Sequence, residues 1–238
     1  MVEVKKYHLP PTSLVPNSPH ALLHYPGLLL SSSSSSPTTT DTPDASSSHS
    51  SIATRAYDLF TSNGWDTQWI FRYGTSQRSH YHSGVHECMA VLTGSATIRF
   101  GVADTVDDLD ESTYSPGGRE AGGVEVEARA GDVFVLPAGT AHKTFNAMPE
   151  AEFKLLTPGD GHAVATHGGH GESIKATLAN VELSGFTMIG AYPRGGGQWD
   201  FAKGGEDVGR FDRVWAVPKP ENDPVLGKAD EGLVGQWR

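Results

Sequence analysis

Cysteine is nearly absent: Cys88 is the single cysteine among 238 residues, so no disulfide can form within the chain. Nothing in this count points to an oxidising compartment, where small domains are often held together by disulfides. Long apolar runs are missing as well, and the cluster of residues 28–30 is too short for a secretion signal or a membrane span. We therefore predict a cytoplasmic protein with no membrane partner.

Basic residues are in deficit, with 18 Lys and Arg against 28 Asp and Glu, which gives a formal net charge of -10. A nucleic-acid partner is excluded on this ground, because binding a phosphate backbone requires a basic surface. The acidic surplus favours solubility and identifies no partner of opposite charge. Glycine and proline are abundant, at 28 and 15 residues, which favours many turns and short strands over long helices.

The length fits one domain preceded by an N-terminal arm, residues 1–51. Residues 31–51 are rich in Ser and Thr and cannot bury enough apolar surface to offset their ordering entropy, so we predict a disordered insertion there. Residues 1–30 contain apolar positions that fit either a short edge strand or an arm laid over the domain. Residues 52–238 are predicted to form the single domain.

Periodicity predicts one short helix followed by many strands. Apolar residues recur at helical spacing over residues 52–62, and Asn63 with Gly64 marks the helix end. Alternation then predicts a strand over residues 65–73. Further strands are predicted at residues 80–82, 87–92, 96–100, 124–128, 133–136, 141–145, 152–156 and 186–191. Short strands between Gly and Pro turns indicate an all-β antiparallel sandwich or barrel. Residues 102–123 and 157–185 are predicted to be long solvated loops, with a lid over the barrel as the alternative.

Metal-ligand chemistry is concentrated in His80, His82, Glu87 and His142. Two histidines at i and i+2 on a strand project from one face. Imidazoles with a carboxylate suit a divalent transition metal such as Fe, Mn, Ni, Zn or Cu better than Ca or Mg. Four protein ligands around a six-coordinate ion would leave two positions open for chemistry.

The spacing around these residues is typical of a known family. Gly74, His80, His82, Glu87 and Gly94 are separated by five, one, four and six residues; Gly131, Pro137, Gly139, His142 and Asn146 are separated by five, one, two and three. This pattern resembles both signature motifs of the cupins. The resemblance implies a double-stranded β-helix, or jelly-roll barrel, and assigns the metal ligands, residue by residue, as His80, His82, Glu87 and His142.

Other segments, among them residues 63–65, 71–74 and 190–193, resemble small stand-alone cupins of bacteria and fungi. Fungal members often act in polyketide pathways. The resemblance implies a metal-dependent oxidoreductase acting on a small aromatic or polyketide-derived molecule in secondary metabolism, with Glu87 and His142 as the catalytic residues. A metal-dependent isomerase, epimerase or lyase is the alternative, as is a non-catalytic module that binds a metal or small molecule. Cupins commonly pair, which favours a homodimer formed through residues 1–30.

Several nearby residues allow two interpretations. His86 alternates away from Glu87 on a regular strand, although a turn before it would allow it to act as a ligand or to support one. Cys88 is expected to be a packed small hydrophobe and not a redox centre. The three histidines of the glycine-rich loop suit either an auxiliary metal site or a solvated loop; they are His162, His167 and His170.

The walls of the pocket are less well specified by the sequence. Trp69, Phe71 and Tyr73 share a strand face and form either an aromatic wall or ordinary core. Arg72 and Arg99 are candidates for binding a substrate anion, with surface charge as the alternative. Four further residues are placed on the faces that carry Glu87 and His142: Met89, Val91, Thr144 and Asn146.

Overall fold

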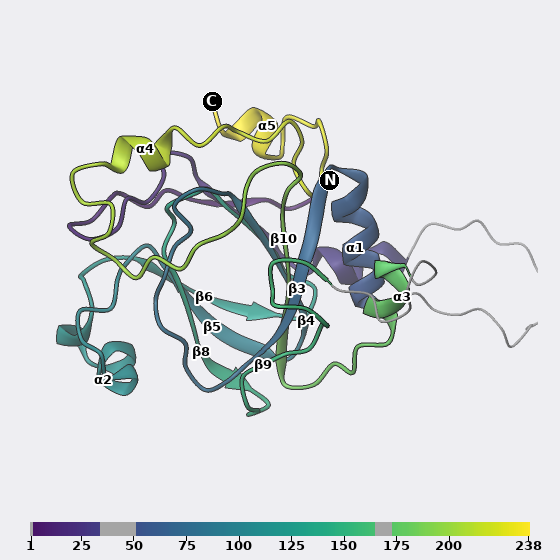
Figure 1. The fold of residues 1–238 in the computed structure, drawn as a ribbon, viewed down its shortest axis with the longest axis horizontal. Coiled ribbons are helices and arrows are strands. Elements are labelled where there is room, and N and C mark those ends of the chain that lie inside the picture. Colours follow the sequence, from purple (N-terminus) through teal and green to yellow (C-terminus); the bar gives the residue numbers. More distant parts are fainter. Residues whose placement is uncertain (1, 34–50, 165–172) are drawn as a thin grey trace, which may run out of the picture.

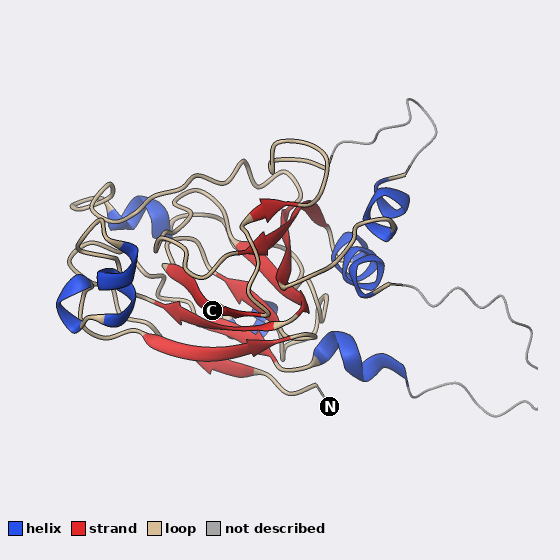
Figure 2. Cartoon of the chain, turned by 90° about the horizontal axis from the view of Figure 1, so that it is seen from below, coloured by secondary structure: helices blue, strands red, loops and turns tan. Residues whose placement is uncertain are grey.

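The computed structural model describes residues 2–33, 51–164 and 173–238 (Figure 1). Most of the Ser/Thr-rich insertion predicted at residues 31–51 therefore lies outside the described residues, as do His167 and His170. Two antiparallel sheets dominate the described part of the chain, in agreement with the predicted all-β jelly-roll barrel (Figures 1 and 2).

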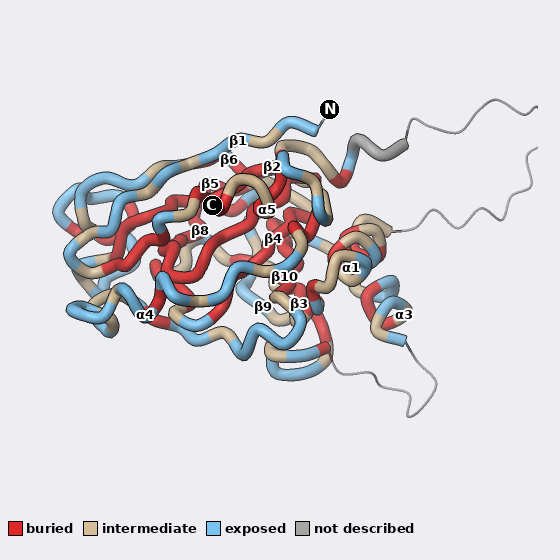
Figure 3. Tube along the Cα trace, turned by 90° about the horizontal axis from the view of Figure 1, so that it is seen from above, coloured by how far each residue is buried: buried red, intermediate tan, exposed pale blue. Residues whose placement is uncertain are grey.

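The larger sheet has seven strands and the smaller has three. The order in the larger is β1 (Lys5–Tyr7), β2 (Leu22–Tyr25), β7 (Val133–Leu136), β4 (Glu87–Thr93), β10 (Phe186–Pro193), β3 (Trp65–Tyr73) and β9 (Lys154–Leu155). The order in the smaller is β6 (Val124–Arg129), β5 (Ser95–Phe100) and β8 (His142–Met148). Figure 3 shows β4 and β10 buried along their length, whereas β1 is exposed at the edge.

Alternation along β4 divides the apolar side chains between two cores. Met89 and Val91 belong to the core enclosed by the two sheets, together with Ile98 of the smaller sheet. Cys88 and Ala90 point the other way, into an outer core on the far side of the larger sheet. The inner core borders the cavity described below, so β4 separates the site from the outer packing.

Helix α1 (Ile52–Ser62) covers this outer core and has the bounds predicted from the sequence. Ser51 caps its N-terminus by accepting a hydrogen bond from Thr54 N–H at 3.2 Å. Gly64, which follows Asn63, has φ +81°, a conformation that glycine adopts without strain. A second helix, α3 (Ile174–Ala179), adds Leu178 to the same core and was not predicted.

The N-terminal segment completes the larger sheet. β1 pairs with β2, and β2 pairs with β7. Of the two interpretations of residues 1–30, the structure supports the edge strand, while β2 was not predicted. The buried Asn17 fastens the segment, because its Nδ2 donates to Pro10 O at 2.7 Å and Gly101 O at 2.8 Å. The homodimer through these residues stays a prediction.

The C-terminal segment crosses the outer core and is held by a buried aspartate. Two short helices lie on it, α4 (Phe211–Trp215) and α5 (Leu233–Gln236). Asp223 is fully buried and accepts hydrogen bonds from Tyr25 Oη at 2.5 Å and from Leu233 N–H at 2.8 Å. Trp237 Nε1 donates to Ala21 O at 2.8 Å. The end of the chain is therefore tied to β2, near the start of the chain.

Residues 102–123 are more ordered than the solvated loop predicted from their acidic, glycine-rich composition. They form α2 (Leu109–Tyr114) and a 3-10 turn, η2 (Pro116–Gly118); another 3-10 turn, η1 (Leu28–Ser33), follows β2. Asp104 forms a buried salt bridge with Lys143 at 3.0 Å. Arg99 donates to Thr113 O at 2.7 Å. These contacts anchor the segment to β5 and β8, and none of its residues lines the cavity described below.

In the described parts of the chain, no helix combines the length and the apolar composition that crossing a membrane requires.

Candidate metal centre

Three buried imidazoles converge at one end of the barrel. The ligand atoms of His80, His82 and His142 all lie within 4.8 Å of one another. His142 begins β8, whereas His80 and Tyr81 form isolated bridges, in place of the regular strand predicted over residues 80–82. His80 N–H donates to His142 O at 3.1 Å, and His142 N–H donates back to His80 O at 2.8 Å. The two signature motifs are thus joined through their backbones.

A tight turn at Gly139, just before His142, holds the backbone of His82 in place. Gly139 N–H donates to His82 O at 2.8 Å, and Gly139 has φ +85°, which an L side chain rarely adopts. A Cβ atom at this position would lie 2.7 Å from Val214 Cγ1 and 3.0 Å from Pro16 Cγ. The dihedral angle and the lack of space for a Cβ atom both favour glycine at position 139, in the turn before His142.

Each of the three imidazoles has its Nδ1 against a backbone carbonyl oxygen. The pairs are His80 with Arg78 O at 3.2 Å, His142 with Thr140 O at 3.3 Å, and His82 with Asp200 O. A carbonyl oxygen only accepts, so Nδ1 of each ring carries a proton and Nε2 is the atom left for a metal. At His82, Nε2 lies 3.1 Å from Glu87 Oε1 and must give up the proton shared with that carboxylate before it binds a cation. Such contacts orient metal-binding imidazoles and fix their tautomer. The three residues can therefore hold a metal ion through Nε2.

Glu87, the first residue of β4, lies beside these nitrogen atoms. Its Oε1 is 3.1 Å from His82 Nε2, and its Oε2 is 3.5 Å from His142 Nε2. Tyr192 Oη donates to Oε1 at 2.5 Å, whereas the buried Oε2 has no hydrogen-bond partner among the described residues. A buried carboxylate oxygen without a partner fits a cation ligand. Glu87 as the fourth ligand stays a prediction.

The electrostatics of this carboxylate favour its ionised form. Burial alone would raise the pKa of Glu87, but the charge and hydrogen bond of His82, the charge of His142 and the hydrogen bond from Tyr192 lower it to about 2. The site therefore presents an anionic oxygen beside three imidazole nitrogen atoms, a mixed N/O set that fits a divalent transition metal.

The three imidazoles differ in their titration. Burial, and then the neighbouring histidines, hold the pKa of His80 well below its usual value. Burial also lowers the pKa of His142, although Glu87 opposes the shift. For His82 burial again lowers the pKa, but the charge and hydrogen bond of Glu87 outweigh it, so the net shift is upward. Metal binding requires the neutral imidazole, so a bound cation competes with a proton at His82.

The sequence left open whether His86 points away from Glu87 or acts as a metal ligand or its support. In the structure His86 is not a ligand, because both of its ring nitrogens make other hydrogen bonds. Ala138 N–H donates to its Nδ1 at 2.9 Å, and its Nε2 donates to Pro218 O at 3.2 Å. Both ring nitrogens are therefore used, and burial lowers the pKa of His86 to about 4. The residue connects the turn of the second motif to the C-terminal segment.

Two other candidates are removed from the site by packing. Cys88 is buried in the outer core, and burial raises the pKa of its thiol, as expected for a packed hydrophobe. The ring of His162 stacks on Trp199 with centroids 4.3 Å apart. His162 thus supports the cavity wall, and the auxiliary metal site predicted with His167 and His170 cannot be assessed because those two lie outside the described residues.

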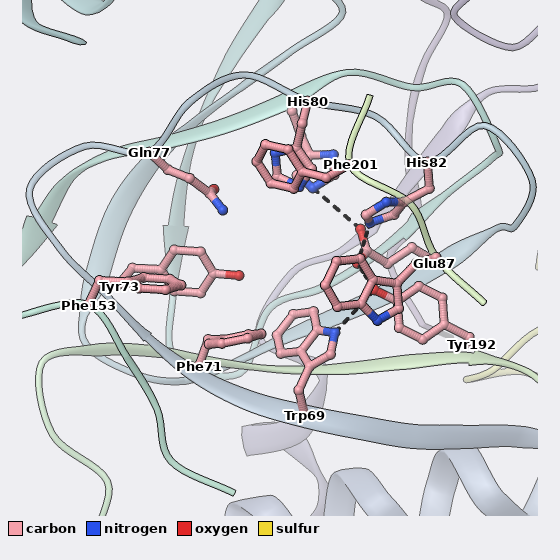
Figure 4. A pocket seen from close by; sticks show the side chains of 12 residues that line it. Trp69, Phe71, Tyr73, Gln77, His80, His82, Glu87, Phe153, Tyr192 and Phe201 are labelled. Carbon is pink, nitrogen blue, oxygen red and sulfur yellow. Dashed lines mark hydrogen bonds and ion pairs between the residues drawn. The ribbon is translucent and has the colours of Figure 1, made fainter. Parts of the chain in front are cut away.

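A cavity of about 70 Å³ opens over the histidines (Figure 4). Both interpretations of Trp69, Phe71 and Tyr73 hold: all three line the cavity, and all three also pack in or against the inner core. Five further lining residues were not predicted as such: Gln77, Phe153, Tyr192, Trp199 and Phe201. Tyr192 did occur in the segment 190–193 quoted for the family resemblance, which was the available signal.

The aromatic side chains also contact the metal-binding residues. Trp69 Nε1 donates to Tyr192 Oη at 3.1 Å, and Tyr192 in turn donates to Glu87. The Phe201 ring stacks on His80 with centroids 3.8 Å apart and an interplanar angle of 12°. The cavity wall and the metal-binding residues therefore form one packed unit.

The two arginines proposed for anion binding are elsewhere. Arg72 donates to Glu152 O at 2.9 Å and Ser184 Oγ at 3.0 Å. Arg99 is buried against Glu125 and the end of α2. Neither lines the cavity, and no Lys or Arg of the described residues does. Four other residues were predicted to share the faces that carry Glu87 and His142. Met89 and Val91 do lie in the inner core, whereas Thr144 and Asn146 do not line the cavity.

Comparison with known proteins agrees with this architecture. The family model described as Cupin matches residues 37–182, more than half of the chain, so the protein belongs to the cupin family. A curated relative, the uncharacterised protein YjlB of Bacillus subtilis (strain 168), is 28% identical over 185 residues, covering 75% of each chain.

Solved structures give weaker likenesses. A structure of oxalate oxidase has a TM-score of 0.27 and 16% identity, and the match covers 71% of this chain and 74% of the oxalate oxidase chain. Hydroquinone 1,2-dioxygenase PnpCD, in complex with Cd2+ and 4-hydroxybenzonitrile, has a TM-score of 0.24 and 10% identity, covering 66% and 82%. Vicilin of hazelnut (Corylus avellana) has a TM-score of 0.24 and 13% identity. The match covers 55% of this chain and 22% of the vicilin chain, so this chain spans under a quarter of that protein. Such low TM-scores support nothing about activity.

Proposed function

We propose that the protein is a metal-dependent oxidoreductase acting on a small aromatic or polyketide-derived molecule in secondary metabolism. The observation that carries the proposal is the placement of three Nδ1-fixed imidazoles beneath an aromatic cavity. A bound redox-active ion such as Fe would polarise a substrate oxygen and mediate electron transfer to O2. The role in secondary metabolism rests on the resemblance to fungal cupins.

The proposal gives each residue of the centre a role. His80, His82 and His142 would hold the ion through Nε2. Glu87, ionised because its pKa is lowered to about 2, would complete the ligand set. So low a pKa makes it a weak base, so accepting a proton from the substrate would require that pKa to rise on substrate binding. Tyr192 fixes the orientation of this carboxylate through its 2.5 Å hydrogen bond.

The aromatic wall suits a flat substrate and limits the access of water. Offset or edge-on contacts between aromatic rings add to the free energy gained from burial. Trp69 and Phe71 present a tilted pair with centroids 5.1 Å apart, and Phe71 stacks on Phe153 at 5.2 Å. A planar substrate would extend this series of ring contacts toward the histidines.

An isomerase, epimerase or lyase is the second candidate, and the Glu87–Tyr192 pair favours it. A carboxylate hydrogen-bonded to a phenol beside the metal ligands is suited to moving a proton without any change of oxidation state. Zn, Ni or Mn at the centre would fit this activity. A non-catalytic binding module remains the third alternative.

Metal analysis combined with oxygen uptake distinguishes these functions. The purified protein would be assayed for metal content and then mixed with a panel of phenols and 1,3-diketones in an oxygen electrode. Bound iron with substrate-dependent O2 uptake, lost in His142→Ala, supports the oxidoreductase. Turnover by zinc- or nickel-loaded protein without O2 contradicts it and supports the isomerase or lyase.

A further inference from the structure

Two side chains in the cavity wall, Tyr73 and Gln77, have polar atoms that make no hydrogen bond with any of the residues the structure describes. Tyr73, at the end of β3, is only 4% exposed, yet its hydroxyl makes no hydrogen bond with any described residue. Gln77 follows four residues later, and its buried Oε1 has no hydrogen-bond partner. Figure 4 shows the Tyr73 hydroxyl and the Gln77 carboxamide pointing into the same cavity, on the side away from Tyr192.

Both side chains start from well-fixed positions. The Tyr73 ring lies edge-on to Phe186 at 5.8 Å and to Phe153 at 6.0 Å. Gln77 N–H donates to Thr144 O at 2.8 Å, which ties its backbone to β8. Buried polar groups in folded proteins are nearly always hydrogen-bonded, and the exceptions call for an explanation such as a ligand. Here the free groups face a cavity, so a ligand can supply the missing partners.

The charge of the cavity limits what that ligand carries. Among the described lining residues no Lys or Arg is present, and Glu87 supplies the acidic group. A carboxylate at the Tyr73 side of the cavity would find no cation to pair with it, and desolvating an unpaired charge is costly. An uncharged hydroxyl group loses far less on burial, and it can accept a hydrogen bond from the Tyr73 phenol and donate one to Gln77 Oε1.

We propose that Tyr73 and Gln77 form a recognition subsite for an uncharged hydroxyl group at one end of a planar organic molecule. The other end of that molecule lies against His80, His82 and His142. The inference deepens the proposed function, on which it rests for the use of this cavity as the substrate site.

The size of the cavity adds a condition. Its volume of about 70 Å³ is roughly half that of an engineered apolar cavity that accepts benzene. Phe153 and Phe201 line the cavity and are 58% and 42% exposed. An aromatic ligand therefore enters by displacing these two rings toward solvent, while the buried Tyr73 keeps its place.

Binding of matched phenols tests the subsite. Calorimetric titrations with 4-hydroxybenzyl alcohol and 4-ethylphenol, in which a hydroxyl group and a methyl group occupy the same position, would use the protein as purified and without O2. The wild type is expected to prefer the alcohol, and Gln77→Leu is expected to reduce that preference by about three- to tenfold, the value of one hydrogen bond. Tyr73→Phe is expected to act in the same direction. 4-Hydroxybenzoate should bind more weakly than the alcohol.

Comparing preferences between variants removes the intrinsic difference between the two phenols. Gln68→Leu is the matched control: Gln68 lies on β3, and its Oε1 also lacks a partner, but it does not line the cavity. It should leave the preference unchanged. Equal preferences in the wild type, Gln77→Leu and Tyr73→Phe, each with an unaltered melting temperature, would overturn the subsite, as would tighter binding of 4-hydroxybenzoate.

The two proposals fail separately. A preference that depends on Gln77, in a protein that never consumes O2, supports the subsite and counts against the oxidoreductase. Oxygen uptake by a protein whose ligand preference ignores Gln77 and Tyr73 supports the oxidoreductase and overturns the subsite.

Discussion

Substituting Gly190 by alanine should disturb both the sheet and the site. Gly190, in β10, is paired with Trp69 on β3 and with Met89 on β4. A Cβ atom added at Gly190 would lie 2.1 Å from both Cε2 and Cζ2 of Trp69. No flexible chain end can yield there, because the indole is buried and donates a hydrogen bond to Tyr192. The ring must rotate out of the wall, or the strands must move apart.

The expected magnitude follows from these contacts. Overfilling a packed core costs about 1–3 kcal/mol. Losing the Trp69–Tyr192 hydrogen bond adds about 1 kcal/mol. The free energy of unfolding should therefore fall by about 2–4 kcal/mol, which for a domain of this size lowers the melting temperature by roughly 5–15 °C.

Thermal unfolding followed by circular dichroism provides the measurement, with near-ultraviolet ellipticity as a monitor of the indole. Gly117→Ala is the matched control, because nothing lies within 4 Å of a Cβ atom there and its backbone is unstrained. The control should change stability by less than about 0.5 kcal/mol. A Gly190→Ala variant with wild-type melting temperature and near-ultraviolet spectrum would refute the close packing of Trp69 on β10.

Three further substitutions test other parts of the molecule. Tyr192→Phe removes the donor to Glu87 and should lower the free energy of unfolding by about 1–3 kcal/mol; an unchanged urea midpoint would contradict this. Lys143→Met leaves Asp104 buried without its 3.0 Å partner and should cost about 3–5 kcal/mol, whereas the exposed-pair control Lys175→Met should cost under about 1 kcal/mol; equal losses would refute the contrast. Asp132→Asn tests pH dependence: burial raises the pKa of Asp132, but the His24 ring 3.5 Å away and hydrogen bonds from Gly27 N–H and Arg129 N–H lower it overall. Its stabilisation is therefore complete above the unfolded pKa, about 4, and is lost as pH falls through the lower folded value. The variant's deficit at pH 7 should shrink in acid urea titrations, and a constant deficit would contradict the assignment.

The sequence predicted what depends on local spacing. The α1 helix follows from apolar residues at helical intervals, and the two faces of β4 follow from strand alternation, which placed Met89 inside and Cys88 outside. The convergence of His80 and His142 needed the family resemblance, because the two are distant in sequence and meet only through a backbone bridge.

What escaped prediction depends on contacts between distant segments. Phe201 lies over His80 because Ala202 pairs with Tyr81 in an isolated bridge that no periodicity indicates. His86 is kept from the site by a carbonyl of Pro218, 132 residues later. Residues 102–123 look like a solvated acidic loop, yet the buried charge of Lys143 holds Asp104. Composition alone does not reveal such partners.

Metal content is the measurement that tests the central claim most directly. Wild-type protein and His142→Ala would be incubated with iron or zinc, dialysed, and analysed by mass spectrometry for metal bound per chain. Three Nε2 donors within 4.8 Å predict a single tightly held ion in the wild type. Loss of that ion from His142→Ala, with the far-ultraviolet spectrum of a folded barrel retained, is the expected result. Full occupancy in the variant, or a wild type that holds no transition metal, would contradict the account.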